Sequence, residues 1–99
     1  MMPRGGLSEA RPATEEIQKK VDQVKSQFQK KSNVECTEFK AESYKTQVVA
    51  GTIDYVKVHI GNNKYIHMKI LEPLTHADNE LELLDYQCDK TKDDELVYF

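Results

Sequence analysis

The chain has 99 residues, of which 38% are apolar and 31% are charged, and its 14 basic and 17 acidic side chains give a net charge of −3. This length and composition predict a single small domain over residues 1–99, with one modest core. The mildly acidic balance lacks the clustered Lys and Arg of a nucleic-acid-binding surface, so we expect no nucleic-acid partner.

An arm and a helix are predicted at the start of the chain. Residues 1–12 contain Pro and Gly and little that is apolar besides Leu7, so we expect a flexible or extended arm. Thr14 is placed to cap a following helix, which Ser32-Asn33 would end. Spacings of four, three and four residues give this helix one apolar stripe, formed by Ile17, Val21, Val24 and Phe28.

Alternating apolar residues predict a sheet in the remaining chain. The segments 55–60 and 65–70 alternate strictly, which indicates two half-buried strands joined by the turn Gly61-Asn62-Asn63. Placing both apolar sets on one face requires an odd-length loop or a bulge at this turn. A weaker alternation of Phe39, Ala41 and Ser43 against Lys40, Glu42 and Tyr44 predicts an earlier strand, and Leu81 to Gln87 a later one.

The predicted fold class is α+β, with one N-terminal helix wrapped by a four- to five-stranded antiparallel sheet. The arm would supply the fifth strand. Short connections favour antiparallel pairing, with the sheet face opposite the helix exposed to water. We interpret Asp93-Asp94-Glu95 as a solvated terminus rather than an electrostatic docking segment.

The connection Gln47-Val48-Val49-Ala50-Gly51 is unusual because its tip is apolar. One interpretation is that Val48 and Val49 only continue the preceding strand, and that Gly51 supplies a turn with positive φ. The other interpretation is a contact patch that enters a groove of a partner, where each buried Val contributes about 1.5–3 kcal/mol.

A second connection, Glu72 to Ala77, carries the apolar Leu74 near its crown. Alternate turns of an antiparallel meander emerge at the same edge of the sheet, so this connection should lie beside the Gln47 to Gly51 loop. The start of the arm would emerge near the same edge, where Gly5-Gly6 would let bare backbone enter a narrow space. These three elements would form one wedge.

Several segments resemble the stefins, the unglycosylated intracellular branch of the cystatin superfamily. The resemblance spans nearly the whole chain, and Gln-Val-Val-Ala-Gly is its most specific part. In chain order the similar segments are Gly5 to Ala10, Pro12 to Thr14, Lys45 to Thr52, Lys57 to His59, Asp85 to Gln87 and Asp93 to Leu96.

The resemblance implies a reversible, tight-binding, competitive inhibitor of papain-like cysteine proteases, including lysosomal cathepsins, that plugs the active-site cleft. It implies no catalysis and no cofactor. Thr75 stands where the family usually has Pro, and Pro73 precedes the leucine instead. The protease-binding residues that it implies are Pro3, Arg4, Gly5 and Gly6 of the arm, Gln47, Val48, Val49, Ala50 and Gly51 of the first loop, and Leu74, Thr75 and His76 of the second.

An enzyme and a metal protein are the less favoured interpretations. No Gly-x-Ser-x-Gly or His-Glu-x-x-His pattern occurs, and the three His show no catalytic ordering. His59 and His67 would share the wet face of one hairpin, where we interpret them as solvated rather than as a two-His metal site.

A non-inhibitory binding module is the stronger alternative. In one version the Gln47 to Gly51 loop straightens, and the helix with its strand pairs with a second copy in a domain-swapped dimer. We expect a monomer, with this dimer as its alternative.

We expect the protein to be cytoplasmic and to have no membrane partner. Apolar runs such as Val48-Val49-Ala50 are far shorter than the roughly 20 residues that span a bilayer. Met1 to Gly6 contain no apolar signal-peptide segment. Disulfides are uncommon in that reducing compartment, so Cys36 and Cys88 are predicted to be free thiols.

Overall fold

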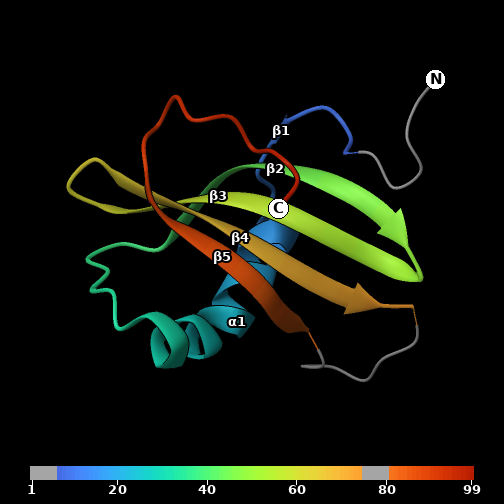
Figure 1. The fold of residues 1–99 in the computed structure, drawn as a ribbon, viewed down its shortest axis with the longest axis horizontal. Coiled ribbons are helices and arrows are strands. Elements are labelled where there is room, and N and C mark those ends of the chain that lie inside the picture. The colour runs from blue at the N-terminus through green and yellow to red at the C-terminus, as the bar shows by residue number, and fades with distance from the viewer. Residues whose placement is uncertain (1–6, 75–80) are drawn as a thin grey trace.

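The computed structural model describes residues 7–74 and 81–99, which form one helix and a five-stranded antiparallel sheet. The strand order is β1-β2-β3-β4-β5, and the helix α1 crosses one face of the sheet (Figure 1). This arrangement confirms the predicted α+β class, with the arm as fifth strand. The elements are β1 Arg11–Pro12, α1 Glu15–Ser32, β2 Lys40–Val49, β3 Gly51–Gly61, β4 Lys64–Pro73 and β5 Glu82–Lys90.

The helix α1 begins and ends where its sequence predicts. The Thr14 hydroxyl accepts a hydrogen bond from the Ile17 amide at 3.2 Å, which satisfies one of the unpaired donors of the first turn. Asn33 ends the helix in the left-handed conformation, with φ of 56°. The apolar stripe is buried against the sheet, and it comprises Ile17, Val21, Val24 and Phe28.

The β3–β4 hairpin uses a bulge to keep both apolar sets on the helix side. His59 pairs with Tyr65, whereas Gly61 pairs with Lys64, so one residue of β3 is absorbed between these pairs. Asn62 and Asn63 form the two-residue turn with φ of 52° and 59°, the left-handed values that such hairpin turns require. The bulge is one of the two solutions that the sequence predicts.

A second bulge makes the predicted alternation of β2 wrong beyond its first residues. The register with β3 shifts between Ala41 and Ser43, which reverses the face that each later residue occupies. Tyr44, rather than the predicted Ser43, therefore packs against the core beneath α1.

The second sheet face is covered, so the prediction of a wet face is wrong. Leu96 packs with Ile53 and Tyr55 in a second small core, and Leu7, Leu71 and Phe99 lie against it. The segment 91–99 crosses this face in front of the sheet (Figure 1). The sequence did not indicate this covering, because the apolar residues of the segment, at 96–99, form a run that is too short to show a periodic pattern.

His67 lies on this covered face and is completely buried, which corrects its interpretation as a solvated histidine. Neither ring nitrogen has a hydrogen-bond partner among the described residues. The pKa of His67 is lowered to about 4, first by burial and then by the charges of the nearby Lys90 and Lys57, whereas Asp94 acts in the opposite direction. Because protonation would place an uncompensated charge inside the protein, the folded state keeps this imidazole neutral.

We predict an acid-dependent loss of stability from His67. Its folded pKa is below the value of about 6.5 for an unfolded chain, so the unfolded state binds the proton first as the pH falls. The destabilisation develops between pH 6.5 and pH 4 and reaches about 2 kcal/mol near pH 4.5. Urea unfolding at pH 7 and pH 4.5 measures this loss. In His67→Leu the loss should shrink by that amount, and an unchanged loss would contradict the assignment.

Candidate functional site

Exposed apolar side chains gather at one edge of the sheet. Val48 is 76% exposed at the end of β2, Val49 is 43% exposed, and Leu74 is 81% exposed just after β4. We refer to Val48, Val49 and Leu74 as the apolar edge. The β2–β3 tip and the end of β4 lie together on the right of the molecule, with the β3–β4 turn at the opposite end (Figure 1).

The two interpretations of the first loop describe different aspects of the same hairpin. β2 continues through Val49, which pairs with Gly51, and Gly51 turns the chain with φ of +114°. The strand therefore does extend into the tip, as the structural interpretation holds. The Val48 and Val49 side chains are nevertheless exposed there, which the contact-patch interpretation requires.

Gly51 also lets the second connection pack against the first. A methyl group on Gly51 would collide with the Glu72 carbonyl oxygen and would lie 2.8 Å from the Leu74 amide nitrogen. Gly51 pairs with Pro73 across the β3–β4 ladder, so the two tips are neighbours, as the meander topology predicts. A shallow groove of about 340 Å³ separates them and is lined by Val48, Val49, Gly51, Thr52, Glu72, Pro73 and Leu74.

The Gln47 side chain points away from this surface. It is 9% exposed, and its Oε1 accepts a hydrogen bond of 3.2 Å from the Tyr55 hydroxyl. This contact anchors the base of the β2–β3 hairpin on the covered face. Among the candidate residues of the hairpin, Val48, Val49 and Ala50 are exposed, whereas Gln47 is buried.

The described part of the arm lies along β2 up to the base of the hairpin. The Ser8 amide donates to the Thr46 carbonyl at 2.9 Å, and the Thr46 amide donates to the Ser8 hydroxyl at 3.0 Å. Leu7 packs on the second core. The remaining candidate residues, Pro3, Arg4, Gly5, Gly6, Thr75 and His76, lie outside the described residues.

A buried ion cluster lies between α1 and this edge, and the sequence interpretation missed it. Lys20 Nζ contacts Asp54 Oδ2 at 2.7 Å and Glu72 Oε1 at 2.6 Å. Burial acts to lower the pKa of Lys20, but the hydrogen bonds and charges of Asp54 and Glu72 outweigh it and raise the pKa above the usual value. Lys20 is therefore a permanent cation at neutral pH.

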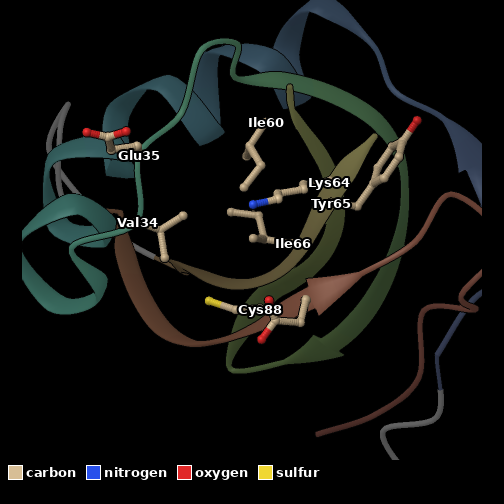
Figure 2. A pocket seen from close by; sticks show the side chains of 8 residues that line it. Val34, Glu35, Ile60, Lys64, Tyr65, Ile66 and Cys88 are labelled. Carbon is tan, nitrogen blue, oxygen red and sulfur yellow. The ribbon is translucent and has the colours of Figure 1, made fainter. Parts of the chain in front are cut away.

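A separate hollow of about 360 Å³ lies near the β3–β4 turn, away from the apolar edge. Figure 2 shows the Cys88 sulfur on its wall, directed toward Val34. Both Cys36 and Cys88 are free and half-buried, and burial raises the pKa of each thiol. Neither cysteine is thus an activated nucleophile at neutral pH.

The described ranges were also compared with the requirements of a metal site and of a membrane-spanning helix. Residues 7–74 and 81–99 contain no group of three or more His, Cys, Asp or Glu placed to hold a metal ion. They also contain no helix that is long and apolar enough to cross a bilayer. His59 stacks on Tyr65 at 4.7 Å between ring centroids and lies 3.3 Å from Glu38, so it already has local partners.

Comparisons with known proteins agree with this geometry. Residues 5–93 match the family model described as a cystatin domain. Cystatin-A1 of Sus scrofa is 54% identical over 99 residues, which cover 100% of this chain and 95% of that protein. Cystatin-A of Homo sapiens is also 54% identical, over the full length of both chains. Leukocyte cysteine proteinase inhibitor 1 of Sus scrofa is 50% identical over 99% of this chain and 95% of its own.

Proposed function

The chain belongs to the cystatin family, and on this premise we propose that its apolar edge and N-terminal arm together occupy the active-site cleft of papain-like cysteine proteases. The protein is a cysteine protease inhibitor and not an enzyme. The observation that carries the proposed binding mode is the exposure of Val48 and Leu74, which line the same groove at this edge. Lysosomal cathepsins are the proposed physiological targets.

Binding energetics favour the use of all three elements. Nanomolar affinity requires about −12 kcal/mol net. Burying Val48 and Val49 supplies about 1.5–3 kcal/mol each, and association itself costs several kcal/mol. Leu74 and the arm must therefore add contacts. We propose that Pro3, Arg4, Gly5 and Gly6 contact one side of the cleft, and that Leu74, Thr75 and His76 contact the other.

The hairpin would block the cleft without being cut. A cysteine protease attacks a substrate carbonyl with its thiolate, and this requires an extended peptide in the attack geometry. The peptide bonds at the tip are held in a ladder in which Val48 pairs with Thr52 and Val49 with Gly51. A tip constrained in this way cannot extend through the catalytic position, so it fills the space that a substrate needs.

Papain whose active-site cysteine has been carbamidomethylated tests this binding mode. The proposal requires no bond to the thiolate, so the protein should still bind the blocked enzyme with a Kd within the nanomolar range. Calorimetry gives the Kd, and mass spectrometry after incubation with active papain checks that the chain is intact. Loss of all binding to the blocked enzyme, or cleavage within 47–51, would contradict the proposal.

The arm is tested by Gly5→Arg. A glycine leaves the backbone bare, whereas a long charged side chain would need space and desolvation in a narrow cleft. We predict that the inhibition constant for papain rises by about 10-fold or more, on the order of 1.4 kcal/mol. Glu9→Arg, at an exposed position that is outside the proposed contacts, is the control. Equal affinity of Gly5→Arg and the parent protein would remove the arm from the proposal.

We propose that the monomer is the inhibitory form and that it acts in the cytoplasm. A domain-swapped dimer would straighten the tip between β2 and β3 and so remove the bend that presents Val48. Size-exclusion chromatography with papain inhibition assayed across the peaks distinguishes the two forms. Inhibition by a larger species would contradict the monomer proposal, and cell fractionation tests the location.

A further inference from the structure

We propose that Lys20 is a positioning residue that holds Ser8 of the arm, the β2–β3 hairpin and Leu74 in one fixed arrangement. Lys20 is not itself one of the proposed protease-binding residues, because it lies on α1 beneath the sheet with 9% of its surface exposed. This inference rests on the proposed function, since it concerns how the same three elements are prepared for binding. Its basis is a chain of contacts that leads from one ammonium group to each element.

The first branch leads from Lys20 to the hairpin and the arm. Asp54 on β3 accepts from Lys20 through Oδ2 at 2.7 Å, and its Oδ1 accepts from the Thr46 hydroxyl on β2 at 3.2 Å. Thr46 and Ser8 are joined by two hydrogen bonds, one of 2.9 Å from the Ser8 amide to the Thr46 carbonyl and one of 3.0 Å from the Thr46 amide to the Ser8 hydroxyl. The carboxylate of Asp54 therefore links both strands of the hairpin, and Thr46 carries the link to the arm.

The second branch leads from Lys20 to Leu74. Glu72 on β4 contacts Lys20 Nζ at 2.6 Å and pairs with Thr52 of β3. Only Pro73 separates Glu72 from Leu74, and the Glu72 carbonyl lies directly against Gly51. A displacement of Glu72 would therefore move the backbone on which Leu74 is presented.

Burial of the charged groups favours this one arrangement of the strands over others. The side chains of Lys20 and Asp54 are 11% and 2% exposed, so separation from each other would leave a charge inside the protein without its partner. Any movement of β3 against α1 is opposed by that penalty. Holding three contact elements in their bound arrangement before association reduces the ordering cost of binding.

A role in positioning differs from a role in overall stability. Replacing a whole buried ion group by well-packed hydrophobic residues of similar volume is often close to neutral for stability, whereas removing one partner alone is destabilising. The triple variant Lys20→Met/Asp54→Asn/Glu72→Gln removes all three charges together. This variant should remain folded, but it should lose the electrostatic preference for one arrangement of the contact elements.

The experiment compares this triple variant and Lys20→Met with Lys25→Met. Lys25 is a matched control because it lies on the same helix and loses the same charge, but it contacts the Phe39 ring, which precedes β2 at the far end of the sheet. Papain inhibition constants and thermal unfolding are measured for each. Amide hydrogen exchange of the free proteins reports on Ser8 and Thr46, with Val58 as a reference in the core.

We expect the triple variant to bind papain about 10-fold more weakly, with faster exchange at Ser8 and Thr46 and unchanged exchange at Val58. Adding Leu74→Ala should then cost less affinity than it costs the parent protein, because Leu74 is already poorly placed. Lys25→Met should leave affinity and exchange at these amides unchanged. Parent-like affinity and exchange in a folded triple variant would overturn the inference, whereas failure of the parent protein to inhibit would contradict the proposed function instead.

Discussion

Gly51→Ala is expected to weaken papain inhibition by about 100-fold or more while the core beneath α1 stays intact. The added methyl group would collide with the Glu72 carbonyl and crowd the Leu74 amide. The φ of +114° would also become strained for any side chain, at a cost on the order of 1–3 kcal/mol. Both effects separate the β2–β3 tip from the second loop, so Val48 and Leu74 could no longer enter one cleft together.

Gly61→Ala is the matched control for this prediction. Gly61 has a similar φ of +105°, but it lies at the opposite end of the sheet, and its added methyl group would meet the Thr37 side chain. We expect a comparable loss of stability in urea unfolding with little change in the inhibition constant. If Gly51→Ala binds papain as tightly as Gly61→Ala does, the proposed coupling of the two loops is wrong.

Val48→Asp is the second substitution with a large expected effect. Val48 is 76% exposed in the free protein, so the change should leave the unfolding free energy nearly unaltered. In the complex it would remove about 1.5–3 kcal/mol of apolar burial and would also bury a carboxylate. We expect the inhibition constant to rise by about 100-fold or more in steady-state assays with papain.

The same substitution at Val97 gives the control for Val48→Asp. Val97 is 45% exposed in the C-terminal segment and belongs to none of the three proposed contact elements. Val97→Asp should therefore inhibit like the parent protein. Equal inhibition by Val48→Asp and Val97→Asp would show that the apolar edge does not enter the cleft.

The helix and the main strands could be predicted because their local patterns agree with their packing. The stripe from Ile17 to Phe28 and the strict alternation of 55–60 and 65–70 leave one arrangement that buries both apolar sets. The position of the apolar edge followed from topology, since alternate turns of a meander share one end.

The bulge in β2 and the covering of the second face could not be predicted in the same way. A bulge changes the face of every later residue without altering composition, so the alternation around Ala41 could not locate it. His67 and Tyr55 are amphipathic and occur on wet and on buried faces alike. Tyr55 is covered by the distant Leu96, Tyr98 and Phe99, and His67 lies near Asp94 of the same segment. No periodic pattern links this segment to the sheet.

The ion cluster left a signal in the sequence that the apolar patterns concealed. Lys20 follows Ile17 by three residues and precedes Val24 by four, so it occupies a core position of the helix. Asp54 and Glu72 likewise continue the core-facing alternations of their strands. Three charged residues of both signs at core positions indicate a buried ion group, although only the fold reveals that it joins the contact elements.

Steady-state inhibition of papain by the purified monomer, measured at several enzyme concentrations, is the decisive test of the proposed inhibition. The proposed blocking of the cleft predicts tight, reversible and competitive inhibition, with an IC50 that rises with the enzyme concentration and a chain that remains uncut. An uninhibited enzyme at micromolar monomer, or inhibition that disappears as the chain is cleaved, would contradict it.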